Sequence, residues 1–416
     1  MRGTFGPASR SGSRRGALWA LIGGDSVSIT GNTLTMVAVP WFVLQTTGSA
    51  ALTGVAGSAL VLPNLISGVL GGPLVDRLGH RRVSIVSDLA SGVTVAAIPL
   101  LHLANALNYP VLLVLIFLGT LLDVPGEIAR RALLPDVAEQ TTVPLERATS
   151  VREGAVRVAQ MVGAPLAGFL IALLGAAQAL FVDAATFAIS ALLVWRFVLR
   201  QTTVHESERR GAYLTALRGG LSLVWNDRLM RAILAMLMIA NLLDFGLLAV
   251  LFPLYADQVL SGPTDLGLMI GAFAMGSLLG TIAYGALGPR LPRRLTFFIV
   301  FLISGAPRLF LLAAQPGLVI ILPVFLVLGI AGGAINPLLM VVAYERIPAT
   351  ARGRVIGVIR AASWGAMPLG TLLAGFLSES IGLGTALLIL GTLYLLATLS
   401  PAIGRVWSEM DRAPAT

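Results

Sequence analysis

One short stretch decides the fold: Gly72-Pro73-Leu74-Val75-Asp76-Arg77-Leu78-Gly79-His80-Arg81-Arg82. It separates two long apolar runs with turn-forming and charged residues. Gly79 permits a tight reversal of the chain, and Asp76 can pair with an arginine or cap a neighbouring helix. The stretch is therefore predicted to join two membrane helices on the side where arginines gather.

The composition around this stretch is that of a membrane protein. The chain has 416 residues, of which 56% are hydrophobic and 12% charged. A soluble domain carries about 25% charged residues, so a soluble enzyme and a disordered protein are both excluded. All 29 basic residues are arginine, and the net charge is +9. These charges are too sparse for a contiguous basic face, so no nucleic-acid partner is expected.

Long apolar runs recur along the whole chain. A bilayer core of about 30 Å needs about 20 apolar residues of helix. The sequence therefore predicts an all-α membrane protein with twelve transmembrane helices. The expected spans are 17–45, 50–75, 83–104, 109–134, 150–174, 177–199, 231–256, 264–288, 295–314, 317–344, 355–378 and 382–404.

The arginines fix the expected orientation. They gather before the first span, in alternate loops and after the last span, whereas the opposite loops carry Asp257, Asp265 and Glu379. The positive-inside rule then places both termini in the cytoplasm of a multi-pass protein of the cell (inner) membrane. Only three arginines are expected clearly inside spans: Arg157, Arg308 and Arg360.

The two halves of the chain repeat one another. Pro40 and Pro253, Gly54 and Gly267, and Arg77 and Arg290 lie 213 residues apart, and Gly154 and Gly357, and Arg157 and Arg360, lie 203 apart. A longer connection between the fourth and fifth spans explains the change of offset. The repeat predicts two pseudo-symmetric six-helix bundles. The expected division is a tail 1–16, a bundle 17–199, a linker 200–230, a bundle 231–404 and a tail 405–416.

The stretch at 72–82 resembles the signature loop of the major facilitator superfamily, although His80 replaces a basic residue. Its second-half copy has Pro289 at the position of Asp76. Residues 40–49, 132–136, 181–187 and 347–355 resemble the enterobactin-exporter and macrolide-efflux branch. The resemblance implies the twelve-helix major facilitator fold, alternating access and a monomer. It also implies proton-coupled export of amphipathic small molecules such as a drug, natural product or siderophore.

Acids inside the spans are candidates for proton coupling, because intramembrane charge is costly. Asp25 lies near mid-depth of the first span and forms one polar helical stripe with Ser28, Asn32 and Thr35. The stripe is expected to line a central cavity, with Asp25 as the coupling carboxylate or as a carboxylate satisfied by packing. Asp244 is a second coupling candidate, or a binding group for a cationic substrate.

Other polar residues are assigned by position. Asp123, Glu127, Arg130 and Arg131 occupy neighbouring turns of the fourth span and suggest a charge network, in which Glu127 can pair with either arginine. Asp88 and Asp183 are interpreted as structural. Arg308 has no partner that the sequence identifies.

Two further groups complete the candidate sites. A conformational gate is expected from Gly72, Asp76, Arg77, Gly79, Arg81 and Arg360, with Asp76 and Arg360 pairing across the halves or Arg360 extending to the membrane interface. Besides the stripe, the candidate cavity residues are Asn241, Tyr284, Asn336 and Trp364.

Several activities lack their residues. A phosphate-binding loop with its lysine is absent, so ATP is not expected to drive the protein. The three histidines are scattered and there is no cysteine, so neither a metal site nor a cofactor is expected. No catalytic grouping is apparent, so the chain is not expected to be an enzyme. An uncoupled facilitator or importer, and a non-transporting receptor or scaffold, remain alternatives to an exporter.

Overall fold

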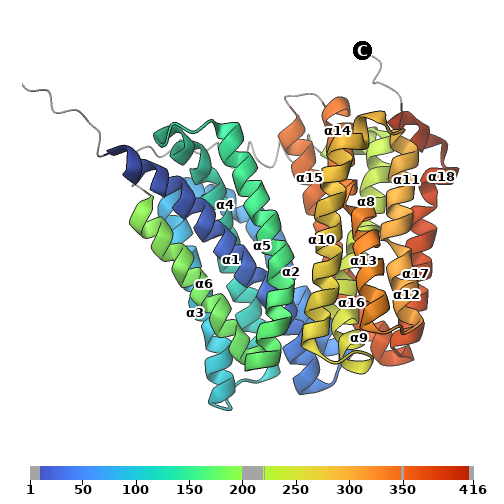
Figure 1. Ribbon diagram of the computed structural model, residues 1–416, viewed down its shortest axis with the longest axis horizontal. Coiled ribbons are helices and arrows are strands. Elements are labelled where there is room, and N and C mark those ends of the chain that lie inside the picture. Colours follow the sequence, from blue (N-terminus) through green and yellow to red (C-terminus); the bar gives the residue numbers. More distant parts are fainter. Residues whose placement is uncertain (1–9, 199–218, 220, 348–350, 412–416) are drawn as a thin grey trace, which may run out of the picture. The chain divides into compact units, whose positions relative to one another are not determined.

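The computed structural model describes residues 10–198, 219, 221–347 and 351–411, and their side chains except those of 10–15, 68–74, 76, 353 and 405. The first half of the chain forms six long helices (Figure 1). They are α1 (Arg10–Thr47), α2 (Ala50–Leu78), α3 (His80–Leu103), α4 (Tyr109–Gln140), α5 (Leu145–Leu174) and α6 (Ala176–Phe197).

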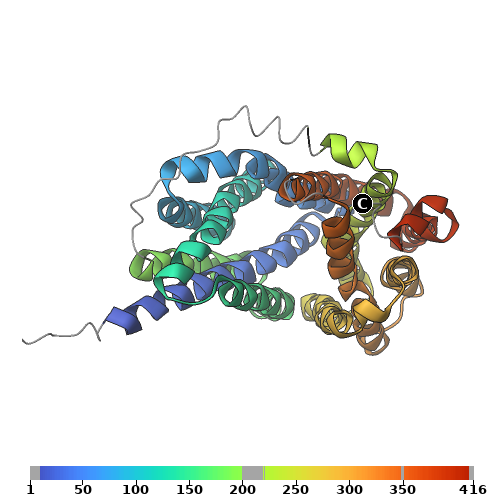
Figure 2. The same ribbon diagram turned by 90° about the horizontal axis from the view of Figure 1, so that it is seen from above.

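The second half also forms six spans, most of them from consecutive helical segments. The segments are α8 (Arg228–Gly246), a π-helical turn (Leu247–Leu251), α9 (Phe252–Gln258), α10 (Pro263–Leu287), a 3₁₀ turn (Gly288–Arg290), α11 (Arg293–Ser304), α12 (Ala306–Ala313), α13 (Leu318–Gly333), α14 (Ile335–Arg346), α15 (Arg352–Gly365), α16 (Met367–Ile381), α17 (Leu383–Thr398), α18 (Ser400–Ile403) and a 3₁₀ segment (Arg405–Met410). Within each half, Figure 2 views many of these helices nearly end-on.

The prediction of twelve spans is confirmed. Twelve helices of the described chain are long and apolar enough to cross a membrane. Two differences from the predicted helix ends change the layout of the chain. The first helix begins at Arg10, inside the segment expected as a tail. The additional residues of the connection between the fourth and fifth spans lie in helical extensions, because α4 continues to Gln140 and α5 begins at Leu145.

Proline accounts for the breaks in the second half. Pro307, Pro337 and Pro368 lie two, three and two residues after the breaks that precede α12, α14 and α16. Proline lacks an N–H group and its ring disfavours helical backbone at the preceding residue. The spans are therefore continuous helices in the first half and mostly segmented in the second.

The contacts divide the chain into two compact units. The first unit comprises residues 1–35, 66–163 and 177–207, and the second comprises 36–65, 164–176 and 208–416. The second unit thus includes parts of α1, α2 and α5. Small residues allow close packing there: a Cβ added to Gly54 would lie 2.4 Å from the Thr371 carbonyl oxygen, and one added to Gly168 would lie 2.3 Å from that of Pro263.

Two arginines at equivalent positions of the repeat make equivalent hydrogen bonds. Arg81, which follows the turn at Gly79, donates to the carbonyl oxygens of Trp195 and Val198 at the end of α6. Arg294 lies 213 residues later and donates to the carbonyls of Pro401 and Ala402 in α18. In each half, the same guanidinium therefore satisfies carbonyl groups at the end of the last span.

Candidate functional site

A buried arginine on α4 is the centre of the first unit. Arg130 Nε donates to Asp25 Oδ1 at 2.9 Å, and its Nη1 donates to Asp88 Oδ1. Its Nη2 lies 3.8 Å from Asp123 Oδ1 and 3.4 Å from the Ser28 hydroxyl oxygen. The Arg130 side chain is only 1% exposed. One guanidinium thus holds acidic side chains from α1, α3 and α4 inside the unit.

A second arginine reaches the same cluster from α5. Arg152 Nη2 lies 2.6 Å from Asp25 Oδ2, and its Nη1 donates to Glu153 at 2.9 Å. The Arg152 side chain is buried, whereas that of Glu153 is 55% exposed. Asp25 therefore lies between two guanidinium groups. We call Asp25, Asp88, Asp123, Arg130 and Arg152 the buried cluster.

Close packing of α3 against α4 makes this arrangement possible. A Cβ added to Gly126 would lie 2.9 Å from the Cβ of Ser87 and 3.5 Å from Asp88 Oδ1. One turn further, the Ser91 hydroxyl donates to the carbonyl oxygen of Gly119 at 3.1 Å. The small residues on α4 bring Asp88 within reach of Arg130, because they leave no side chain between the two helices.

The charges of the buried cluster do not balance. It holds three carboxyl groups and two guanidinium groups, so the ionised cluster carries one surplus negative charge. Asp123 has the longest contact with Arg130, and its second oxygen accepts from the Asn32 amide at 2.8 Å. An uncompensated charge within a membrane protein is costly. One proton would bring the cluster to neutrality.

The polar stripe on α1 was expected to line a central cavity, which stays a prediction, and its side chains bond inside the first unit. Asp25 and Ser28 are fully buried within the first unit, where both accept hydrogen bonds from Arg130. Asn32 and Thr35 are half-buried and also bond inside the unit, to Asp123 and Asp183.

The expected network on α4 forms only in part. Arg131 donates to Glu127 at 2.5 Å, which selects the pairing four residues apart. This pair is considerably exposed, whereas Arg130 is buried and pairs with acids of α1 and α3 as well as with Asp123 of α4. The two neighbouring arginines therefore have different environments. Asp88 and Arg152, which the sequence left outside the candidate sites, belong to the buried cluster.

A smaller charged group lies in the second unit. Arg308 on α12 pairs with Asp244 on α8 at 2.5 Å, so Arg308 has a partner that the sequence did not identify. Tyr394 on α17 donates its hydroxyl to the other oxygen of Asp244 at 3.1 Å. The guanidinium of Arg308 also lies 4.6 Å from the ring centre of Phe273. We call Asp244, Arg308 and Tyr394 the second-half triad.

Of the two charged side chains in the triad, only that of Asp244 is exposed. The Arg308 side chain is 7% exposed, whereas that of Asp244 is 41% exposed. The break at Gly305 helps to build the site, because a Cβ there would lie 2.7 Å from the Tyr394 ring. The tyrosine ring therefore packs directly against the α11–α12 junction and presents its hydroxyl to Asp244.

The gate candidates are only partly described. Gly72 and Asp76 lie within α2, but the side chain of Asp76 is outside the described residues, so its predicted pairing with Arg360 is not tested. Arg77 is exposed, and Gly79 adopts a positive φ of 85° at the turn. The guanidinium of Arg360 lies 4.3 Å from the ring centre of Trp364, one turn away on α15.

The remaining cavity candidates lie on separate elements. Asn241 on α8 is half-buried and donates to the Leu237 carbonyl of its own helix at 2.8 Å. Tyr284, Asn336 and Trp364 belong to α10, α14 and α15, with Tyr284 and Trp364 half-buried and Asn336 exposed. Their role in a substrate cavity stays a prediction.

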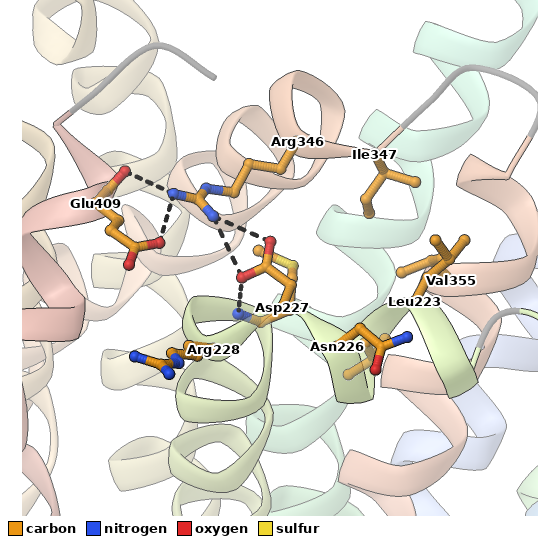
Figure 3. Close-up of a pocket in the computed structure, with 10 residues that line it drawn as sticks. Leu223, Asn226, Asp227, Arg228, Arg346, Ile347, Val355 and Glu409 are labelled. Carbon is orange, nitrogen blue, oxygen red and sulfur yellow. Dashed lines mark hydrogen bonds and ion pairs between the residues drawn. The ribbon is translucent and has the colours of Figure 1, made fainter. Parts of the chain in front are cut away.

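A pocket that the sequence did not suggest lies at the start of α8 (Figure 3). It has a volume of about 530 Å³. Arg346 donates to the carboxylate of Asp227 at 3.0 Å and to that of Glu409 at 3.2 Å. Asp227 also caps α8 by accepting from the backbone N–H groups of Leu229 and Met230. The ion pairs therefore tie three segments together at this end of the second unit.

Among the described residues, no group of three or more acidic or histidine side chains could hold a metal ion. The functional candidates are thus the two sets of intramembrane charges. Both sets arise from contacts between helices that lie far apart in the sequence.

Comparisons with known proteins agree with this architecture. The Major Facilitator Superfamily model matches residues 21–260 and 234–414. The chain is 34% identical to multidrug efflux pump Tap of Mycolicibacterium fortuitum, over 96% of this chain and 98% of that protein. It is 24% identical to macrolide efflux protein A of Streptococcus pyogenes, over 94% and 95% of the two chains. The crystal structure of the nucleoside transporter NupG aligns with a TM-score of 0.74 at 14% identity, over 93% and 98% of the chains, which concerns the fold alone.

Proposed function

The chain belongs to the Major Facilitator Superfamily and is a membrane transporter, not an enzyme, and we propose that it exports amphipathic drugs in exchange for protons. Two relatives that match almost the whole chain are described as efflux proteins, one for multiple drugs and one for macrolides. These names support export as the direction and drugs as the substrate class. Their similarity extends over both halves, so the proposal concerns the complete twelve-span unit.

The proposed setting is the cell (inner) membrane, with a monomer whose two termini lie in the cytoplasm. The distribution of arginines along the chain supports this orientation. The proposed moving parts are the bundles 17–199 and 231–404, joined by the linker 200–230 and flanked by the tails 1–16 and 405–416. The repeated arginine contacts at the ends of α6 and α18 support this division into halves.

The surplus carboxyl group of the buried cluster carries the proposal of proton coupling. With one proton bound, three carboxyl groups and two guanidiniums are neutral together, and the cluster can remain buried. Loss of that proton leaves one net negative charge, which favours a conformation where water reaches the cluster. A cycle that loads the proton from outside and releases it inside would then couple the gradient to conformational change.

We assign the exchangeable proton to Asp123, because its contact with Arg130 is the weakest of the three acids. Asp25 contacts two guanidiniums and is the anchor that keeps the cluster assembled. This assignment changes the initial expectation, in which Asp25 itself carried the proton.

The direct test is proton release when substrate binds to the purified protein in weakly buffered detergent solution. The wild type is expected to release about one proton per bound substrate, whereas Asp123→Asn is expected to bind substrate without proton release. Asp183→Asn is the matched control, because Asp183 is equally buried in the same unit but bonds to the hydroxyls of Thr35 and Thr186. Loss of release in Asp183→Asn with normal release in Asp123→Asn would overturn the assignment.

Transport in inverted vesicles separates exchange from the alternatives. Drug uptake into the vesicles should require a pH gradient in the wild type and become independent of it in Asp123→Asn. Uptake that ignores the gradient in the wild type would indicate an uncoupled facilitator, and the opposite direction would indicate an importer. Asp25→Asn is expected to lose gradient-driven uptake, and intact uptake would remove Asp25 from the coupling machinery.

The gate is proposed to consist of the loop around Gly72, Asp76, Arg77 and Gly79 together with Arg360. The chain contains no cysteine, so a single introduced pair can be cross-linked cleanly. Asp76→Cys with Arg360→Cys should cross-link when the cytoplasmic side closes. The absence of a cross-link in every condition that supports transport would exclude their pairing. Arg81 is reassigned to holding the end of α6, as its two carbonyl contacts indicate.

A further inference from the structure

The second-half triad has the form of a binding site. Asp244 lies 16 residues after the first residue of a span that covers Arg228–Gln258, and is therefore near its middle. Ionisable side chains at this depth face a bundle interior or an aqueous pathway, and they seldom face lipid. The Asp244 side chain is 41% exposed, so a polar group can approach it.

The exposed end of the triad is negative. The guanidinium of Arg308 is covered by Asp244 on one side and by the Phe273 ring on another, and the residue is 6% exposed. Its Nε is also buried without a hydrogen-bond partner among the described residues. A ligand that approaches the pair therefore meets the carboxylate before the guanidinium. This order favours a cation or a hydrogen-bond donor over an anion.

Asp244 has acceptor capacity to spare. One oxygen accepts from Arg308 and the other from Tyr394, which is itself 2% exposed. A carboxylate offers about four lone-pair positions, so each oxygen can accept a further donor without loss of its present partner. The ion pair also keeps the empty site neutral as a whole, which reduces the cost of a charge at this depth.

We propose that Asp244 is the recognition group for the positively charged end of amphipathic cations, with Arg308 and Tyr394 as the residues that position it. This inference rests on the proposed export function and adds its substrate class. An ammonium or other cationic centre would approach the open face of Asp244, while Tyr394 and Arg308 hold the carboxylate in place. The apolar part of the ligand would lie on neighbouring span surface.

Binding to the purified full-length chain tests the proposal. Tetraphenylphosphonium serves as the cationic probe and triphenylphosphine oxide as an uncharged probe of related shape. Asp244→Asn is expected to weaken tetraphenylphosphonium binding about tenfold and triphenylphosphine oxide binding less than about twofold, because only the cation loses an ionic contact. Glu345→Gln is the matched control: it removes a carboxylate paired with Arg293 in the same unit, and should change neither affinity.

Two outcomes would overturn the proposal: unchanged cation binding in Asp244→Asn, or an equal loss of both probes, which would indicate a structural role. A measurement on the wild type guards against misfolding of the variant. Carbodiimide labelling of Asp244, detected by mass spectrometry, should be reduced by tetraphenylphosphonium and unaffected by triphenylphosphine oxide. Labelling that neither or both probes reduce would count against cation recognition. These assays use no gradient, so their result is independent of the proton-coupling tests.

Discussion

The first half of the chain buries three acids and two arginines together, whereas the second half leaves the carboxylate of its triad open. In the buried cluster, Arg130 contacts three acids and Arg152 contacts Asp25, and all three carboxyl groups are buried. In the triad, Asp244 is 41% exposed beside a covered Arg308. A closed group with a charge surplus suits proton exchange, and an open neutral pair suits ligand recognition. The two halves of the repeat therefore hold their charges in different environments.

Removal of the arginine at the centre of the buried cluster should have the largest effect on stability. Arg130→Gln leaves three buried carboxyl groups with one guanidinium. Loss of one partner from a buried ionic group costs about 3–5 kcal/mol, so we expect a large fall in the thermal unfolding temperature in detergent or a failure to accumulate folded protein.

Arg131→Gln is the matched control for this variant. Arg131 is the next residue and also forms an ion pair, but its side chain is 43% exposed. Exposed ion pairs contribute about 0–1 kcal/mol, so the unfolding temperature should hardly change. Similar losses in the two variants would show that burial of Arg130 does not set the stability of the first unit.

The acids of the buried cluster should differ in how much they contribute to stability. Asp25→Asn weakens contacts with two guanidiniums, at 2.9 Å and 2.6 Å, and should cost about 2–3 kcal/mol. Asp123→Asn removes the surplus charge and disturbs one long contact of 3.8 Å, so it should cost less than Asp25→Asn. Thermal unfolding of the two variants under one condition measures the order. A larger loss in Asp123→Asn would mean that Asp123 is a structural anchor and would remove the basis for assigning the proton to it.

The triad should depend on the close contact between Gly305 and the ring of Tyr394. In Gly305→Ala the new Cβ would meet the Tyr394 ring at 2.7 Å and the Phe301 carbonyl oxygen at 2.9 Å. Overpacking of this kind costs about 1–2 kcal/mol, and the shifted tyrosine should also weaken binding of tetraphenylphosphonium. Gly285→Ala is the control, because a Cβ there meets nothing within 4 Å and alanine favours helix. Normal cation binding in Gly305→Ala would show that Tyr394 does not position Asp244.

The sequence was sufficient for the fold but not for these partners. Twelve spans were predictable because each requires only length and hydrophobicity, which are local properties. The stripe of Asp25, Ser28, Asn32 and Thr35 was also visible, because helical periodicity places residues on one face. What that face contacts depends on the packing of other helices, which periodicity does not contain.

Two arginines show this limit clearly. Arg152 lies near the connection between α4 and α5 and has the sequence context of a cytoplasmic anchor, yet its side chain is buried against Asp25. Arg308 had no visible partner because Asp244 precedes it by 64 residues and lies on another span. The one available signal is that an intramembrane arginine requires an acid on some other span. The repeat could not help, because residues 213 positions earlier, Gly31 and Val95, are not charged.

The smallest expected effect lies at a third kind of acid, on the surface. Glu379 of α16 accepts from the backbone N–H groups of Ala50 and Ala51, at 2.7 Å and 3.2 Å, and from the Ser49 hydroxyl at 3.2 Å. It thus caps the start of α2, a helix of the other sequence half. Asp265 is a matched acid, because it accepts from the backbone N–H of Ser261 at 2.9 Å but joins residues of the second half only.

Glu379→Gln and Asp265→Asn should each cost only about 0.5–1 kcal/mol of stability, the usual contribution of an exposed cap.

Their effects on conformation should differ. Alternating access requires the two halves to separate at a contact such as that of Glu379, so Glu379→Gln should increase the population with these ends apart. Distance measurements between labels on cysteines introduced at Thr47 and Ser380 would detect the shift. An equal shift in Asp265→Asn would attribute it to general loosening, and no shift in either would mean that the cap does not hold the halves together. Surface charge would then contribute only to local helix ends, and the control of conformation would rest on the buried cluster and the gate.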